Sequence, residues 1–390
     1  MRSYKIGLTL ALLLLLAVLW INIVPALLER SMNITLSHEA AAVGPAASRL
    51  HSKLVVGDLH ADSLLWRRNL LRHSSRGHVD IPRLQAGNVA LQVFTAVTQS
   101  PAGLNYGQNA RDSRDNITLL ALAQAWPVAT WTSRYQRALY QARRLHRFAE
   151  RAPRDLQVIT NRQQLRQLLQ ARQQGAALVG GILGTEGSHA LDGELDNIRG
   201  LHEHGYRVMG LHHFFDNALG GSLHGESGQG LTAFGEQAVD QMRSLGIIID
   251  VAHSSEQVVR DVLARDETPL LLSHSGFQGH CPSQRNISDE LMQAIAAGGG
   301  LIGVGFWEAA VCDASPAGIA AAIRYGIALV GADHLALGSD FDGAVSVPFD
   351  SSELATLTQA LLDAGISPQD IRKVMGGNLV RFFDAQLPAD

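Results

Sequence analysis

The chain has 390 residues, of which 46% are hydrophobic, and a formal net charge of −4. This apolar fraction is enough to bury a large core, so the length allows two domains or one large α/β barrel and argues against a disordered chain. The small net charge, without a long basic run, argues against a nucleic-acid-binding protein.

The first predicted element is an apolar segment from Ile6 to Leu28, which contains no charged residue and follows Arg2 and Lys5. As a helix it would be about 34 Å long, enough to cross a bilayer. The residues that follow offer no clear small-x-small cleavage site, so we predict a signal anchor over residues 1–30, with a cleaved signal peptide as the alternative. The preceding positive residues place the rest of the chain outside the cytoplasm, which would be the periplasm if the host is a bacterium.

After a mostly small and polar segment, predicted as a linker over residues 31–52, short apolar runs alternate with helix-like segments. Such alternation is typical of a parallel sheet covered by helices on both faces. The predicted strands are Lys53–Asp58, Val89–Val97, Ala177–Leu183, Arg207–Leu211, Gly246–Val251, Pro269–Leu272, Gly300–Gly305 and Leu335–Gly338. The predicted helices are Ser133–Arg151, Arg162–Arg172, Leu191–His204, Thr232–Leu245, Ser255–Ala264, Ser288–Ala297, Ala317–Val330, Ser352–Ala364 and Pro368–Phe383.

Eight such units favour a (β/α)8 TIM-type barrel over residues 53–386. An open doubly wound sheet usually has fewer strands, and no glycine-rich phosphate loop follows the first strand. We predict a long insertion at about residues 99–156, rich in aromatic side chains, as an extra helical layer or part of a lid.

Side chains of the metal-binding type follow six of the eight predicted strands, where a parallel barrel usually has its active site. A single His after a strand is usually structural, and a single Asp is usually a helix N-cap, but their recurrence argues for a joint site. His and carboxylate ligands suit zinc, and a bridging carboxylate would allow two ions that activate water and stabilise an oxyanion. The residues are His60 and Asp62, Glu186, His212 and His213, His253, His274, and Asp340 and Asp342.

Longer motifs surround these residues, in one order, over about residues 53 to 385. They are Asp58-Leu-His60-Ala-Asp62, Arg76-Gly-His-Val-Asp-Ile-Pro-Arg-Leu84, Glu186-Gly-Ser-His-Ala-Leu-Asp192, Gly246-Ile-Ile-Ile-Asp-Val-Ala-His253-Ser254, Ser273-His274-Ser275, Cys281-Pro-Ser-Gln-Arg285-Asn286, Gly338-Ser-Asp340-Phe-Asp342-Gly343 and Gly377-Asn378-Leu-Val-Arg-Phe382. In these motifs the chain resembles the membrane dipeptidase (renal dipeptidase) family of zinc metallopeptidases, within the amidohydrolase-like barrels.

The resemblance implies two zinc ions per chain. His60 and Asp62 would bind one ion, His253 and His274 the other, and Glu186 would bridge them. The same ligands could also hold manganese or iron.

The resemblance also implies the catalytic roles. His213, chosen over His212 by counting along the fourth strand, would polarise the scissile carbonyl. Arg285 would bind the terminal carboxylate of the substrate, and Asp340 would carry a proton to the leaving amine. Cys281 and Cys312 lie where relatives hold a disulfide, which agrees with export.

The leading hypothesis is therefore a membrane-anchored binuclear zinc dipeptidase that cleaves dipeptides with a metal-bridged hydroxide. One alternative is a dedicated amidase or maturation hydrolase for a peptide-derived metabolite. Another is a non-hydrolytic role in peptide binding. The resemblance also makes a homodimer an expectation.

Overall fold

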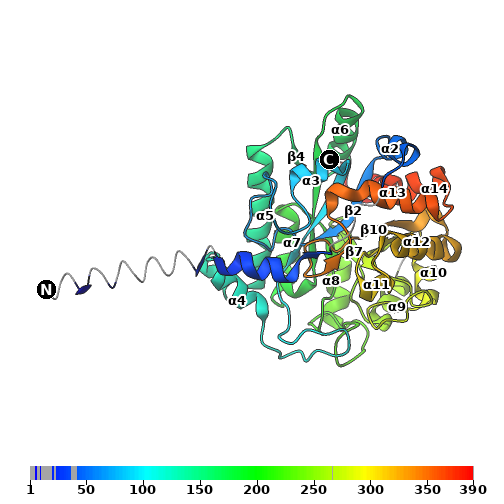
Figure 1. The fold of residues 1–390 in the computed structure, drawn as a ribbon. Helices are drawn as coiled ribbons and strands as arrows, with labels where there is room; N and C mark the ends of the chain where they lie inside the picture. The colour runs from blue at the N-terminus through cyan, green and yellow to red at the C-terminus, as the bar shows by residue number, and fades with distance from the viewer. Residues whose placement is uncertain are drawn as a thin grey trace.

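The structure, a computed structural model, describes residues 5–6, 9, 20–21, 23–36, 42–265 and 267–389. Figure 1 shows strands at the centre of the molecule and helices around them. No helix among these residues is long and apolar enough to cross a membrane. Most of the predicted signal anchor, including residues 10–19, lies outside the described part of the chain.

Eight parallel strands form a closed barrel, which confirms the predicted (β/α)8 fold. Their order around the barrel is β2, β10, β9, β8, β7, β6, β5 and β3, and the ring is closed by β3–β5 and β2–β3 pairing. The strands are β2 (Val56–Ala61), β3 (Val89–Val97), β5 (Val179–Glu186), β6 (Tyr206–Gly210), β7 (Ile248–Asp250), β8 (Leu271–Ser275), β9 (Leu301–Val304) and β10 (Leu335–Leu337). A further short strand, β4 (Leu156–Val158), pairs with β5 and was not predicted.

Helices cover the barrel, and the predicted segments are helical in the structure. They are α5 (Arg134–Arg151), α6 (Arg162–Gln173), α7 (Asp196–Glu203), α8 (Ala233–Ser244), α9 (Glu256–Arg265), α10 (Asp289–Ala297), α12 (Pro316–Val330) and α13 (Leu354–Asp363). Helices that were not predicted are α2 (Pro45–His51), α3 (Ile81–Ala86), α4 (Asn116–Ala123) and α11 (Glu308–Val311).

Two predicted helices differ from the structure because glycine and left-handed residues interrupt them. The helix predicted from Leu191 begins only at Asp196, because Asp192 (φ 50°) and Gly193 (φ 81°) form a turn. The helix predicted over Pro368–Phe383 is divided into α14 (Pro368–Arg372), a π-helical turn (Lys373–Gly377) and α15 (Asn378–Gln386). The backbone at Gly376 is non-helical, and a Cβ there would lie 2.0 Å from the Val55 carbonyl oxygen.

The barrel interior is filled by apolar side chains from every strand, as expected for a closed parallel barrel. One buried cluster joins residues from all eight strands to residues of α15 and α6. Its strand members are Leu59, Leu91, Val93, Ile182, Val208, Ile248, Leu271, Leu301 and Ala336. Because this packing closes the interior, ligands can reach the barrel only at its ends.

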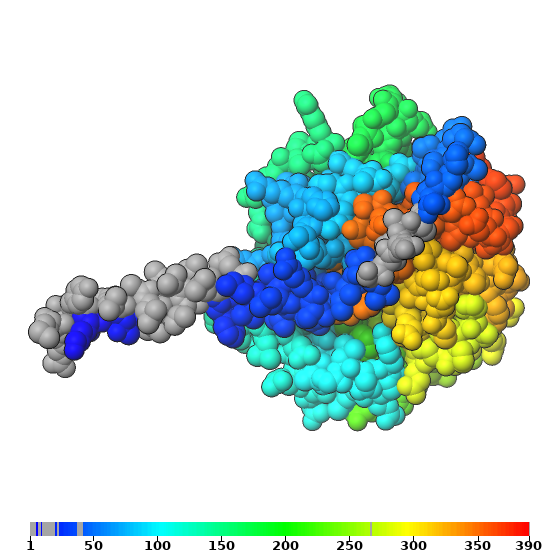
Figure 2. All heavy atoms as spheres, in the orientation of Figure 1, coloured from blue at the N-terminus to red at the C-terminus, as the bar shows by residue number. Residues whose placement is uncertain are grey.

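The segment before the barrel is folded against it. Within the predicted linker, residues 45–51 form α2, which packs against α13, and the His51 ring lies 2.8 Å from the Thr358 hydroxyl. Further upstream, residues 23–32 are helical and lead into a strand, β1 (Ile34–Thr35), that pairs in parallel with β11 (Ser346–Val347). Figure 2 shows this segment, in dark blue, lying across one face of the molecule.

A buried ion network fixes the helix at residues 23–32. The Glu29 carboxylate is only 1% exposed and lies 3.1 Å from an Arg68 guanidinium nitrogen and 2.5 Å from Nε of Arg76. Arg68 also pairs with the buried Asp342, next to the loop that follows β10. A neighbouring contact comes from the Asn33 side chain, which accepts a hydrogen bond of 2.8 Å from the Ala344 amide.

We expect Glu29→Ala to release this helix, because it removes the buried carboxylate through which the helix pairs with Arg68 and Arg76. Amide hydrogen exchange over residues 23–36 should accelerate by about 100-fold, which corresponds to the loss of about 3 kcal/mol. Arg30→Ala, at the next residue, is the control, because the Arg30 side chain is exposed and bonds only to Ser75. Equal exchange rates in the two variants would contradict the structural role of Glu29.

Candidate metal centre

Six of the eight barrel strands bring His or acidic side chains to one end of the barrel. His60 lies in β2, His274 lies in β8, and Glu186 is the last residue of β5. The other predicted residues follow their strands within a few positions: Asp62 after β2, His213 after β6, His253 after β7 and Asp340 after β10. Because all strands are parallel, these carboxyl-terminal ends share one face, and the structure brings these seven residues together there, whereas His212 and Asp342 are not in the cluster.

The Glu186 carboxylate is the centre of this cluster and is only 5% exposed. Its Oε1 atom lies 3.5, 3.3 and 3.4 Å from the Nε2 atoms of His60, His253 and His274. Its Oε2 atom faces the other way, 3.4 Å from Nε2 of His213. A single carboxylate therefore faces ring nitrogens supplied by four different strands.

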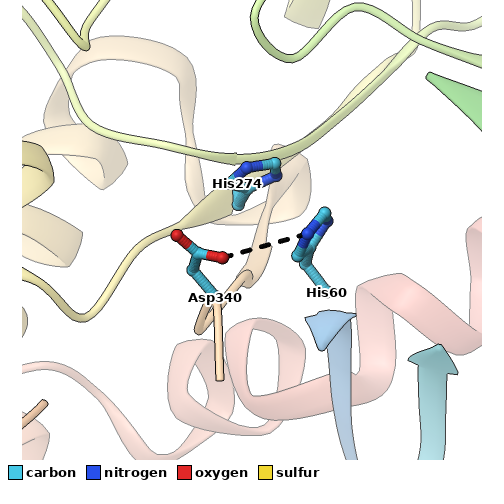
Figure 3. A group of neighbouring side chains, drawn as sticks. All are labelled: His60, His274 and Asp340. Carbon is cyan, nitrogen blue, oxygen red and sulfur yellow. Dashed lines mark ion pairs between the residues drawn. The ribbon is translucent and has the colours of Figure 1, made fainter. Parts of the chain in front are cut away.

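The ligand-type atoms form three overlapping groups, in each of which all atoms lie within 4.8 Å of one another. The groups are His60, Asp62 and Glu186; His60, His274 and Asp340; and Glu186, His213 and His253. Figure 3 shows the second group, with an Asp340 oxygen directed at the His60 ring, 3.9 Å from Nε2. Shared members make this one continuous cluster.

The donor set fits divalent metal ions of the zinc type. The Nε2 atoms of His253 and His274 are 3.0 Å apart. Two nitrogens bound tetrahedrally to one zinc at about 2.1 Å would lie roughly 3.3 Å apart. Burial and the neighbouring Arg285 guanidinium hold the pKa of His253 well below its ordinary value, and burial does the same to the pKa of His274. Both rings are therefore neutral and have a lone pair for a metal.

Hydroxyl groups that the sequence did not single out hold the ligands in place. The Thr95 hydroxyl in β3 donates a 2.6 Å hydrogen bond to Asp62. The Ser273 hydroxyl lies 2.8 Å from Nδ1 of His274 and 3.4 Å from Nδ1 of His60. Such second contacts orient metal-binding imidazoles, leaving the opposite nitrogen free. Thr95 carries no sequence signal, because it lies inside an apolar strand, whereas Ser273 precedes a candidate ligand.

The structure distinguishes the two neighbouring histidines after β6. His213 faces Glu186, whereas Nδ1 of His212 lies 3.0 Å from the Ser254 hydroxyl. Burial lowers the pKa of His212 to about 4, so this ring is neutral and structural. The Nδ1 atom of His213 lies 3.1 Å from the Gln99 carbonyl oxygen, in the insertion.

Two site residues have left-handed backbone conformations, which are uncommon outside glycine. His253 has φ 60° and Asp340 has φ 60°. Such conformations cost about 1–3 kcal/mol and are kept where the surrounding structure enforces them, often at functional sites. Here they turn the side chains back over the barrel mouth.

Arg285 is a buried cation with few protein partners. Its guanidinium donates a 2.8 Å hydrogen bond to the His274 carbonyl and stacks 5.3 Å from the Trp307 ring centre. No carboxylate among the described residues lies within salt-bridge distance of it. A disulfide, Cys281–Cys312, joins the loop that carries Arg285 to the chain just after Trp307, as the resemblance implied. Since a buried charge without a partner is costly, this guanidinium is suited to bind an anionic group.

Asp340 and Glu186 have opposite shifts of their pKa values. Burial raises the pKa of Asp340 well above the ordinary value; His60 and Arg285 oppose this shift, whereas Glu186 and Asp62 reinforce it. At Glu186, in contrast, nearby His213 and His60 overcome the effect of burial and hold the pKa well below the ordinary value. The two acids therefore differ in proton affinity, which is typical of catalytic carboxylates.

A sequence model of the family described as membrane dipeptidase (peptidase family M19) matches residues 45–388. The chain belongs to this family. Dipeptidase aclJ of Aspergillus oryzae is 35% identical over 213 residues, which cover 52% of this chain and 50% of that protein. The match thus spans only half the length of that curated relative.

Solved structures with a similar fold include two bacterial proteins. A metallopeptidase of Rhodobacter sphaeroides, liganded with a phosphinate mimic of the dipeptide L-Ala-D-Ala, has a TM-score of 0.71 and 23% identity, covering 85% of this chain and 99% of its own. The probable dipeptidase PvdM of Pseudomonas aeruginosa has a TM-score of 0.71 and 19% identity, covering 87% of this chain and 97% of its own. At these identities the likeness confirms the fold.

We expect Glu186→Gln to weaken metal binding by more than about 100-fold, because it removes the charge shared by the four imidazoles. Metal content per chain, measured by mass spectrometry after dialysis, should fall accordingly. Glu194→Gln is a matched control, since Glu194 is exposed in the loop that follows Glu186. Full metal content in Glu186→Gln would show that this carboxylate is not a ligand.

Proposed function

We propose that this membrane dipeptidase family member is a binuclear zinc dipeptidase, and that its barrel is held at the outer side of a membrane by its N-terminal segment. The observation that carries the proposal is the position of Glu186 between two groups of ligands, beside an Arg285 guanidinium without a carboxylate partner. The membrane anchor is supported by the apolar run that begins at Ile6, although its last part, including Val24 and Leu28, lies against the barrel; export is supported by the Cys281–Cys312 disulfide.

The residues divide into two sets of metal ligands. His60 and Asp62 would hold one ion, His253 and His274 the other, and the Glu186 carboxylate would be shared by both sets. Two zinc ions held in this way would lower the pKa of a water molecule to near neutrality and stabilise negative charge on a carbonyl oxygen.

Arg285 would orient the substrate. One guanidinium nitrogen contacts the His274 carbonyl and lies 3.3 Å from Nε2 of His253, and Arg285 lines the same cavity as Glu186 and Asp340. A fixed guanidinium fork binds a carboxylate through two parallel hydrogen bonds. A dipeptide whose carboxylate binds there would present its single peptide bond to the metal ligands, and a long peptide could not extend beyond Arg285.

His213 would bind the carbonyl oxygen of that peptide bond. Its Nδ1 atom faces a carbonyl, so Nδ1 must carry a proton. The Nε2 atom, which lies 3.4 Å from a Glu186 oxygen, can then donate a hydrogen bond only when the ring is an imidazolium. An imidazolium at this place would stabilise an oxyanion more strongly than a ground-state carbonyl.

Asp340 would carry the proton. Its high proton affinity and its position between His60 and the cavity allow it to accept a proton from the attacking water and to release it to the leaving amine.

The proposal is tested by assaying the full-length protein against dipeptides of L-L and L-D configuration, including the L-Ala-D-Ala sequence mimicked in the Rhodobacter relative. We expect release of free amino acids that stops on treatment with a chelator and returns with zinc.

We also expect Asp340→Asn to lower kcat by about 100- to 10,000-fold with unchanged metal content. Loss of metal in this variant would identify Asp340 as a ligand, and absence of cleavage of every dipeptide would refute the dipeptidase proposal.

Arg285→Lys tests the carboxylate site separately. Lysine keeps the charge but loses the planar fork, so we expect KM for dipeptides to rise about tenfold or more while metal content stays unchanged. Dipeptide amides, which lack the carboxylate, should be poor substrates of both proteins. Equal KM values for acids and amides in the unaltered enzyme would contradict this role of Arg285.

A further inference from the structure

The cavity that contains the metal-ligand cluster is larger than the space that the cluster itself occupies. Its volume is about 800 Å³, toward the upper end of the range of about 300–1,000 Å³ for small-molecule sites. The charged and imidazole side chains that line it all belong to the centre described above. They are Asp62, Glu186, His213, His253, Arg285 and Asp340.

The rest of the cavity is lined mainly by apolar side chains, and many of these come from two segments outside the barrel strands. One is α4, within the insertion, and the other is the N-terminal helical segment. The lining residues are Ile117, Leu119, Leu120, Leu122 and Ala123 from α4, and Trp20, Val24, Leu28 and Met32 from the N-terminal segment. We call this part the outer chamber. Figure 2 shows the N-terminal segment, in dark blue, beside the cyan surface that includes the insertion.

The four N-terminal lining residues are spaced four apart, so they form one face of a helix. Ile23 and Leu27 precede two of them by one residue and do not line the cavity, although they too are exposed. The buried contacts of Glu29 with Arg68 and Arg76 fix the helix in this orientation. The chain's own N-terminal segment is therefore a fixed wall of the cavity.

Apolar side chains remain solvent-exposed at the chamber. Leu119 is 49% exposed, Leu122 43%, and Trp20 58%. Contiguous exposed apolar surface is unusual unless it binds something. A cavity that is charged at its inner end and apolar at its outer end is complementary to an amphiphilic molecule, because burial of an apolar chain there would remove its surface from water.

We propose that the outer chamber is a subsite for a long apolar side chain of the substrate, and that Val24 and Leu28 are specificity-determining residues. The dipeptide part would bind at Arg285 and the metal ligands, as in the proposed function on which this inference rests. The apolar chain would extend outward between α4 and the N-terminal helix. The preferred substrates would thus be dipeptides with one large apolar side chain.

The test uses the full-length protein in lipid nanodiscs and a series of dipeptides in which one side chain is a linear alkyl group of about one to twelve carbons. We expect kcat/KM to rise about fourfold for each added methylene group until the chamber is filled. In Val24→Asn/Leu28→Asn this dependence should largely disappear, with KM for the longest substrate raised at least tenfold and kcat for dialanine unchanged.

The matched control is Ile23→Asn/Leu27→Asn, which makes the same chemical change one residue away, outside the lining. This control should keep the dependence of kcat/KM on chain length. Because partition of long substrates into the nanodisc affects both variants equally, comparing them also corrects for that partition. Leu119→Asn/Leu122→Asn tests the facing wall and should behave like Val24→Asn/Leu28→Asn. Hydrogen exchange over residues 23–36 shows whether the helix remains docked in each protein.

An identical chain-length dependence in all these proteins would overturn the subsite. If none of these proteins cleaves any dipeptide, the dipeptidase proposal fails. Calorimetric titration with the same dipeptides then still tests whether the outer chamber binds the apolar chain. Affinity that increases with chain length in the unaltered protein, but not in Val24→Asn/Leu28→Asn, would support it. Affinity independent of chain length would refute it.

Discussion

Four imidazole rings, from four strands or the loops that follow them, direct their Nε2 atoms at one buried carboxylate, that of Glu186. Burying so many polar groups is unfavourable unless they balance one another in charge and hydrogen bonding. The arrangement therefore requires a barrel that closes, because the pairing of β3 with β5 brings β5 to the same mouth as β2 and β8. The site and the barrel depend on each other through this carboxylate.

Ion pairs and a disulfide connect the metal centre to distant parts of the chain. Asp342, two residues beyond Asp340, is paired with Arg68, and Arg68 is paired in turn with Glu29 of the N-terminal helix. The helix that would adjoin a membrane anchor is thereby connected to the loop that carries a proposed proton carrier. The disulfide makes a second connection of this kind, between the loop of Arg285 and the chain beside Trp307. These links give the cavity rigid walls on several sides.

Much of the barrel could be predicted because buried parallel strands are short, apolar and bounded by glycine, and all eight were found close to their predicted positions. The short strand β4 was missed, since three residues show no periodicity. The interrupted C-terminal helix was missed because Gly376 adopts its conformation through a close approach to Val55, which is distant in sequence. The candidate residues were found as a set because they recur after strands, although recurrence could not separate His212 from His213.

The sequence by itself determined the order of elements, the family motifs and the chemical nature of the donor set, because these depend on local patterning and on residue type. Only the tertiary structure decided which atoms meet: that Glu186 lies between His213 and three other rings, that Thr95 supports Asp62, and that Val24 and Leu28 face the same cavity as Arg285. The physical reason is that these contacts join residues far apart in the chain. Their geometry follows from barrel closure and from the buried pairing of Glu29, which no local pattern encodes.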